Sequence, residues 1–293
     1  MKKNILILIS VVLMITGYVF AEVTVIFDSS YSDVDTSVLK NSYIEIFPNL
    51  TFAEADSIAQ DVFAYTGTSL FLDEHHGTAN NLIYRNNDNS ARFQINQVTG
   101  DIFYQEYIES DGDTPGLPPK NKALSLAKKH LKALGLFKDK MHFNGVNTVK
   151  EDVVNGQTGQ TIGSYNKQRI VSFSRKLGGI PVAGASRVVV ILGRNGELAG
   201  LTVRWMDVES VKIPGVIKSS EIKNHLKDKL KVKHKNSDSV LVKKSDLVLY
   251  DDGKGVIEPV LLLQGELTNN GVSFAYNWII PVLTEPKADY PGN

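Results

Sequence analysis

The sequence contains no cysteine in its 293 residues. This absence excludes disulfides, thiolate metal sites, a lipid-modified N-terminal cysteine and a cysteine nucleophile. The sequence also lacks a His-Glu-x-x-His zinc helix, a Gly-x-Ser-x-Gly elbow and a Gly-x-x-x-x-Gly-Lys phosphate loop. Basic and acidic residues are equal in number, 32 each, so net charge gives no support for a nucleic-acid partner. The common signatures of an enzyme are therefore missing.

Residues 1–21 have the pattern of a secretory signal peptide. Two lysines precede an apolar run over residues 5–20, which ends in Val19-Phe20-Ala21. We expect cleavage after Ala21 and an extracytoplasmic location, secreted or in the periplasm or cell envelope of a bacterium. An uncleaved membrane anchor is the alternative, because the run is only slightly short for a membrane span.

The most patterned segment is residues 169–206, in which three apolar runs are separated by two glycine-rich breaks. The first break is a Gly-Gly-Ile-Pro-Val-Ala-Gly corner at residues 178–184, and the second is a Gly-Arg-Asn-Gly turn at residues 193–196. The residues of this turn tolerate positive φ, so it predicts two antiparallel strands with Gly196 at positive φ.

The runs on either side of this turn also predict which faces are buried. In the last run, Leu201, Val203 and Trp205 alternate with polar residues, which is typical of a strand with one buried face. The middle run, residues 188–192, is apolar on both faces and predicts a covered central strand.

The corner, strand, turn and strand of residues 169–206 resemble the PepSY and fungalysin/thermolysin-propeptide group of secreted bacterial domains. That resemblance implies an extracytoplasmic, free-standing module, since no peptidase sequence follows it here. It also implies that the open sheet face and the edge strands are contact surfaces. The group is associated with inhibiting or chaperoning secreted peptidases.

Three helices are predicted, each followed by strands. Thr51 and Glu54 form a capping box before an apolar stripe that ends at Gly67. A second helix is expected over residues 122–134, and a third starts at Ser219 or Ser220. Residues 144–167 are expected to be irregular. The strands at residues 23–27 and 42–47 are expected to join the edge of the first unit.

The expected fold class is α+β, with two or three repeated small units, each a helix packed on an antiparallel sheet in a PepSY-like or cystatin-like arrangement. The predicted division is a signal peptide at residues 1–21, an N-terminal unit at 22–112, a central propeptide-like unit at 113–212 and a C-terminal unit at 213–293.

Five residues are predicted to carry binding: Gly179, Ile180, Pro181, Arg187 and Arg204. The three corner residues set where the following strand edge lies, and the two arginines flank the hairpin. No catalytic residue, metal site or cofactor is predicted.

Four other patterns have simpler interpretations. The cluster at residues 73–76, Asp-Glu-His-His, is expected to be a solvated loop, because consecutive residues rarely supply more than two zinc ligands. The acidic segments 109–113 and 251–255 are expected to be turns. The lysines of residues 223–235 fit a solvated helix face. The aromatic row Phe274, Tyr276 and Trp278 fits the contact between a sheet and its helix.

We therefore expect a non-enzymatic module that binds a peptide or protein segment, such as a secreted peptidase, by strand addition at an exposed sheet edge. Nucleic acid is not expected as a partner, and membrane contact is expected only if the N-terminal segment is uncleaved. Two alternatives stay open: a membrane-anchored regulator of an envelope sensor, and a wall-polymer hydrolase that uses carboxylates such as Glu106 and Asp113.

Overall fold

The computed structural model describes residues 23–107, 112–138, 140–213 and 215–291, so the predicted signal peptide lies outside the described residues. Its helices are α1 (Phe52–Thr66), α2 (Lys120–Ala133) and α3 (Ile222–Lys233). Its strands are β1 (Thr24–Phe27), β2 (Asn41–Ile46), β3 (Phe71–Leu72), β4 (Asn81–Arg85), β5 (Ala91–Asn96), β6 (Ile102–Glu106), β7 (Met141–Val154), β8 (Thr161–Leu177), β9 (Ile180–Gly184), β10 (Arg187–Leu192), β11 (Leu198–Arg204), β12 (Asp207–Lys212), β13 (Ser239–Asp251), β14 (Val256–Asn269) and β15 (Val272–Pro281).

The predicted fold class of small repeated helix-on-sheet units is wrong. All fifteen strands of the described residues belong to one mixed sheet, in the order β12-β2-β14-β13-β9-β8-β10-β11-β6-β5-β4-β3, with β1 on β13, β15 on β14 and β7 on β8. The short strand β9 makes the sheet continuous, because it pairs antiparallel with β8 and parallel with β13. Local sequence patterns do not specify such pairings between distant strands, because packing decides them.

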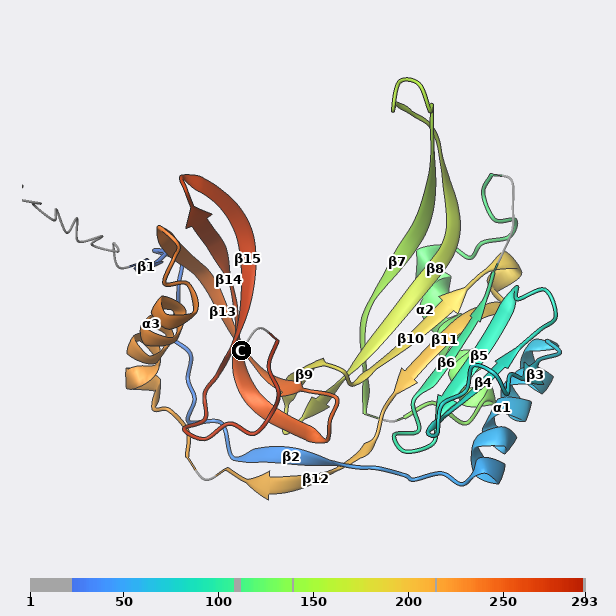
Figure 1. The fold of residues 1–293 in the computed structure, drawn as a ribbon, viewed down its shortest axis with the longest axis horizontal. Coiled ribbons are helices and arrows are strands. Elements are labelled where there is room, and N and C mark those ends of the chain that lie inside the picture. Colours follow the sequence, from blue (N-terminus) through green and yellow to red (C-terminus); the bar gives the residue numbers. More distant parts are fainter. Residues whose placement is uncertain (1–22, 108–111, 139, 214, 292–293) are drawn as a thin grey trace, which may run out of the picture.

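Two halves of the sheet lie on either side of β9 (Figure 1). We call β3–β8, β10 and β11, with α1 and α2, the α1–α2 half. We call β1, β2 and β12–β15, with α3, the α3 half. Each half has its own large core. The chain leaves the α3 half after β2 and returns to it at β12, while β9 joins the halves by pairing with β8 and β13.

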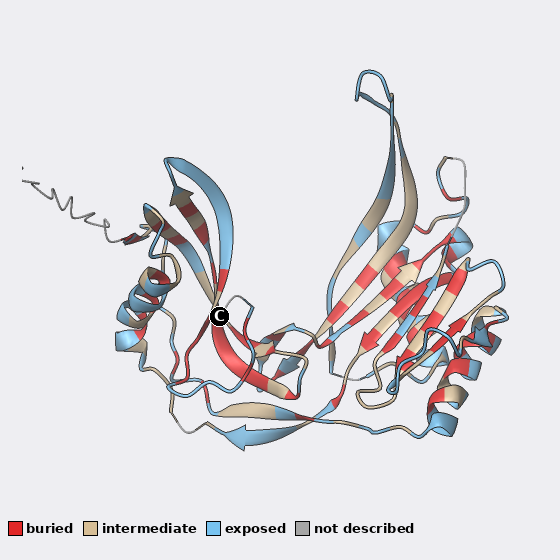
Figure 2. Cartoon of the chain, in the orientation of Figure 1, coloured by how far each residue is buried: buried red, intermediate tan, exposed pale blue. Residues whose placement is uncertain are grey.

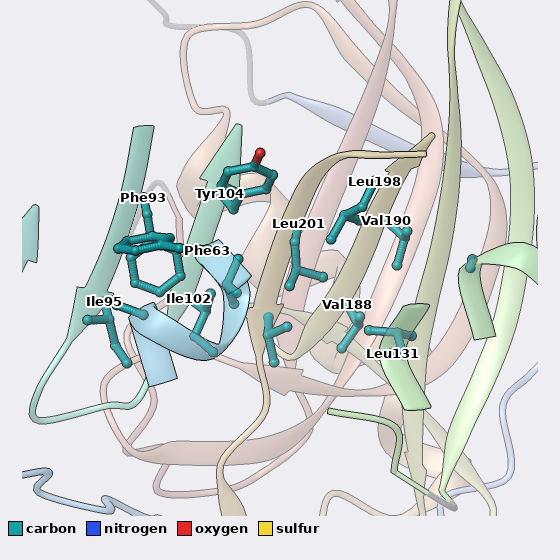
Figure 3. Packing of buried hydrophobic residues seen from close by; sticks show 14 of the residues in the cluster. Phe63, Phe93, Ile95, Ile102, Tyr104, Leu131, Val188, Val190, Leu198 and Leu201 are labelled. Atoms are coloured by element: carbon teal, nitrogen blue, oxygen red, sulfur yellow. The ribbon is translucent and has the colours of Figure 1, made fainter. Parts of the chain in front are cut away.

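The α1–α2 half follows the sequence patterns closely. The Thr51 hydroxyl accepts the Glu54 backbone N–H, the Glu54 carboxylate accepts the Thr51 N–H, and Gly67 ends α1 at a φ of 71°. The apolar stripe of α1 packs on β5 and β6 with Phe63 against Phe93 (Figure 3). The second helix buries Ala123, Ala127 and Leu131 in the same core.

The predicted hairpin of residues 187–204 is present. β10 lies between β8 and β11, as expected of the central strand, and Asn195 and Gly196 have φ values of 54° and 78° in the turn. Leu201 and Val203 are buried, whereas Trp205 is only partly buried against the core. The other face of β10 is half-buried rather than covered.

The α3 half is built on the stripe predicted for the third helix. Ile222, Leu226 and Leu230 of α3 are fully buried against β1, β13, β14 and β15, in a core that includes Trp278 and Ile280. The N-terminal strands belong here, so the prediction that they extend the first unit is wrong. β1 pairs parallel with β13, and β2 pairs with β12 and β14.

Two hairpins extend beyond the cores to the same side of the molecule (Figures 1 and 2). The β7–β8 arm, residues 147–170, occupies the segment that was predicted to be irregular, and that prediction is wrong. The segment is polar because neither face of the arm is buried along β7, so it lacks the apolar alternation from which a strand is predicted. The second hairpin is the β14–β15 arm, residues 264–277, closed by a two-residue Asn270-Gly271 turn at positive φ.

Candidate functional site

The three predicted corner residues lie at the connection between the two halves. Gly178 and Gly179, at φ values of 58° and 86°, turn the chain from β8 into β9. Ile180 packs against both the α3 core and a small cluster beside it, and Pro181 lies opposite Lys176 of β8. The corner therefore joins the halves and does not set a free strand edge, because both sides of β9 are paired.

The two predicted arginines are neighbours. Arg187 of β10 and Arg204 of β11 are cross-strand partners on the sheet face opposite α1 and α2, where they line a shallow hollow of about 270 Å³ with Asn81, Gln94 and Asp101. Arg204 is already engaged, since its Nε lies 3.4 Å from Asp101 Oδ2 and its Nη2 donates to Gly253 O at 2.5 Å. Arg187 is exposed and forms no ion pair with another described residue.

A buried ionic cluster lies beside this hollow, and sequence reasoning missed it. Its members are three carboxyl groups and two guanidiniums: Glu45, Asp101, Asp251, Arg175 and Arg204. Glu45, Asp251 and Arg175 are buried and the other two are half-buried. Each element contributes one group: β2, the β5–β6 turn, and the ends of β13, β8 and β11. One sequence signal existed, because Arg175 occupies a position in the otherwise apolar inward row Val171, Phe173 and Leu177.

The members of this cluster differ in their partners. Asp251 accepts hydrogen bonds from the Ser186 hydroxyl at 2.5 Å and from the Gly253 N–H at 2.7 Å. Arg175, 2% exposed, donates to Met206 O at 2.5 Å and stacks on the ring of Trp205. Neither carboxyl oxygen of Glu45 has a hydrogen-bond partner among the described residues.

Burial, and next the charge of Asp251, raises the pKa of Glu45 from 4.5 to about 8, although Arg204 and Arg175 act in the opposite direction. Burial also raises the pKa of Asp101, with Arg204 opposing. Removal from water lowers the pKa of Arg175, against the attraction of Glu45 and Asp251. At neutral pH the Glu45 carboxyl therefore carries a proton.

The free edge of β15 carries exposed aromatic side chains over six consecutive exposed residues. In the described residues β15 pairs only with β14, and residues 272–277 are exposed on both faces. The aromatic row predicted from the sequence divides in two. Trp278 is buried in the α3 core, where its indole N–H donates to His234 Nε2 at 2.6 Å, whereas Phe274 is 45% and Tyr276 is 40% exposed.

The remaining candidates have structural roles. Asp73 accepts from His76 and pairs with Arg85, and the described residues contain no group of three or more side chains placed to hold a metal ion. In the second acidic segment Asp252 accepts backbone N–H groups of its own turn, and residues 109–111 of the first lie outside the described residues. Lys223 of the lysine-rich helix stacks over Phe27.

The two carboxylates of the hydrolase alternative have separate partners. Glu106 accepts from the Tyr104 hydroxyl at 3.2 Å, and Asp113 accepts the Asn166 backbone N–H at 2.5 Å. Nothing in these contacts indicates catalysis. Among the described residues no helix is long and apolar enough to cross a membrane.

No family model matches the chain, and no curated protein is similar to it in sequence. One similar solved structure is an uncharacterized protein from Eubacterium rectale, with a TM-score of 0.52 and 13% identity over 89% of each chain. Another is the YpeB C-terminal domain of Bacillus megaterium, with a TM-score of 0.38 and 14% identity over 80% of this chain and 94% of that one. The first likeness shows a shared fold alone, and the second is too weak to establish one.

Proposed function

We propose that this protein is a non-enzymatic binding module that takes up an extended peptide or protein segment along the free edge of β15. The observation that carries the proposal is the exposed edge itself, which combines an unpaired strand with the exposed rings of Phe274 and Tyr276. An incoming strand gains backbone hydrogen bonds from such an edge and gains selectivity from alternate side chains.

The register of the β14–β15 arm identifies the backbone groups that are free. In a two-residue hairpin the residues flanking the turn, Asn269 and Val272, form a hydrogen-bonded pair, and hydrogen-bonded and non-hydrogen-bonded pairs alternate from there. Even-numbered residues of β15 therefore bond to β14. Ser273, Ala275 and Asn277 direct their N–H and C=O groups toward the open edge.

The side chains of β15 give the edge two different faces. Phe274 and Tyr276 continue the row of Trp278, and the Tyr276 ring also contacts His234 at the end of α3, while Ser273, Ala275 and Asn277 occupy the opposite face. A partner segment with apolar side chains at every second position buries the two rings on one face and leaves its polar residues on the other.

A proline substitution at the edge tests the proposal. Ala275→Pro removes one outward N–H without removing a bond to β14, and edge strands tolerate proline. The matched control, Ala275→Val, keeps that N–H. Peptides are selected from a displayed random library on the purified protein and then titrated against each variant. We expect Ala275→Pro to weaken binding roughly tenfold, as loss of about one hydrogen bond requires. Equal affinities of the two variants would exclude strand addition at β15.

The partner class follows from the resemblance of residues 169–206 to propeptide domains. We propose a secreted peptidase as the partner, so stoichiometric inhibition of co-secreted metallopeptidases is the assay. Gly179, Ile180 and Pro181 then influence binding through the connection between the halves, while Arg187 contacts the partner on the open face. An activity that hydrolyses peptides or glycans and that copurifies with the chain would contradict a binding role.

We also propose an extracytoplasmic location, supported by the signal-like pattern of residues 1–21. N-terminal sequencing of protein from the envelope or medium is expected to begin at Glu22. Recovery of an intact Met1 in the membrane fraction would instead support the anchored regulator.

A further inference from the structure

Strand β2 buries its charged residue and exposes the two isoleucines on either side of it. Glu45 is 3% exposed, whereas its apolar neighbours Ile44 and Ile46 are 49% and 48% exposed. A shift of one residue in register would bury both isoleucines and return the carboxylate to water, although it would also expose the partly buried Tyr43. Burying a carboxyl without hydrogen bonds is unfavourable, so folding stability alone does not account for this arrangement.

The charges around Glu45 balance only if this residue is neutral. Asp251 and Asp101 supply two negative charges, and Arg175 and Arg204 supply two positive charges. Asp251 accepts two hydrogen bonds, and Asp101 lies beside Arg204. Ionisation of Glu45 would therefore place a fifth, uncompensated charge in the cluster.

Other charged groups near this region already have partners. In the β13–β14 turn, Lys254 bonds to Asp289. On β12 the residue opposite Glu45 is Val208, and Asp207 beside it attracts Arg175. The backbone N–H of Glu45 donates to Gly255 O at 3.0 Å. No described lysine or arginine forms an ion pair with the Glu45 carboxyl.

The cluster is the contact between the two halves of the sheet. Glu45 and Asp251 come from the α3 half, while Arg175, Arg204 and Asp101 come from the α1–α2 half. The apolar cluster at the same place is small, with only four buried residues, Leu177, Val182, Leu249 and Ile257. Electrostatics therefore has more influence on this contact than on either large core.

We propose that the proton on Glu45 is a switch for the contact between the two halves. The neutral carboxyl holds them in the arrangement of Figure 1. Loss of this proton in mildly alkaline conditions loosens the contact and lets the two arms move relative to each other. An ionised Glu45 repels Asp251 and has no hydrogen bonds, so it gains most by reaching water. Because β2, β9 and β12 are the connections between the halves, opening at Glu45 changes the positions of the arms.

Spin labels on the two arms measure this motion. The chain has no native cysteine, so Gln157→Cys on the β7–β8 arm and Asn269→Cys on the β14–β15 arm give two unique labelling sites. We expect a narrow distance distribution at about pH 6 and a broader, shifted one at about pH 9, on either side of the Glu45 transition. In the Glu45→Gln background the distribution at the higher pH is expected to match that at the lower pH.

Two further measurements make the result decisive. Glu209→Gln, on the exposed surface of neighbouring β12, is the matched control and is expected to leave the pH response intact. Carbon-13 NMR of the wild-type carboxyls titrates Glu45 directly, so the test does not depend on the folding of any variant. A Glu45 midpoint in the ordinary range of glutamates would overturn the proposal. So would an arm-to-arm distance that is unchanged between the two pH values.

Discussion

Gly184 ends the Gly-Ile-Pro-Val-Ala-Gly corner, and its replacement by alanine tests why the corner needs glycine there. Gly184 has a φ of 97° and pairs with Asp251 across the parallel β9–β13 contact. A Cβ atom at this position would lie 2.2 Å from the Asp251 carbonyl oxygen. Such an approach is impossible without separating the two strands.

The expected loss of stability has two parts. The positive φ itself costs an L-residue about 1–3 kcal/mol. Separating β9 from β13 also loses the hydrogen bond from Ala185 N to Asp251 O and disturbs the carboxylate that Ser186 binds, which adds about 2 kcal/mol. We expect Gly184→Ala to lower the free energy of unfolding by about 3–5 kcal/mol in total.

Gly179→Ala is the matched control from the same corner. Gly179 has a similar φ of 86°, but a Cβ there meets no atom within 4 Å. The control therefore carries the backbone strain alone, and the difference between the variants, about 2 kcal/mol, measures the close approach of the strands. Equilibrium urea unfolding of both variants gives this difference. Equal losses would refute the argument that strand proximity requires Gly184.

Three further substitutions test the cores and the turn. Leu201→Ala is expected to cost about 2–5 kcal/mol, while Thr202→Ala on the opposite face costs less than about 1 kcal/mol; the reverse order in urea unfolding would mean that the faces are exchanged. Gly196→Val is expected to cost about 1–3 kcal/mol at a φ of 78°, with its Cβ 2.8 Å from a leucine methyl of α2. Burial lowers the pKa of His234, so the unfolded chain takes up the proton first and the free energy of unfolding falls as the pH drops below about 6.5. His234→Gln should flatten that dependence, and equal pH dependences of the two proteins in urea unfolding would contradict this reasoning.

The helices and the local hairpin could be predicted because their signals are local. In α1 a capping box, an apolar stripe and a terminating glycine lie within one segment, and in α3 the apolar residues four apart do. The Asn195-Gly196 turn likewise places β10 beside β11 through two residues. These elements do not depend on distant partners.

The sheet could not be predicted because its order depends on contacts between distant residues. Nothing near β1 indicates a parallel pairing with β13, more than 200 residues later. The β7–β8 arm has no buried face to give an apolar period, so its residues resemble a loop. In β2 both isoleucines are exposed and Glu45 is buried, the reverse of what their polarity predicts. Because of this reversed burial, the sequence did not predict the ionic cluster around Glu45.

The contact between the halves, which includes Gly184, Asp251 and Glu45, couples the Glu45 proton to binding at β15. Each half has a large apolar core, whereas the contact between the halves has only four buried apolar residues. Separating the halves at this contact therefore costs less free energy than disrupting either core. The β14–β15 arm continues directly into the strands that carry this contact. A ligand on β15 that prefers one position of the arm must then change the proton affinity of Glu45, and the Glu45 proton must change the affinity of the ligand by the same factor. Peptide affinity measured on either side of the Glu45 transition would detect this coupling, and the Glu45→Gln variant should lack it.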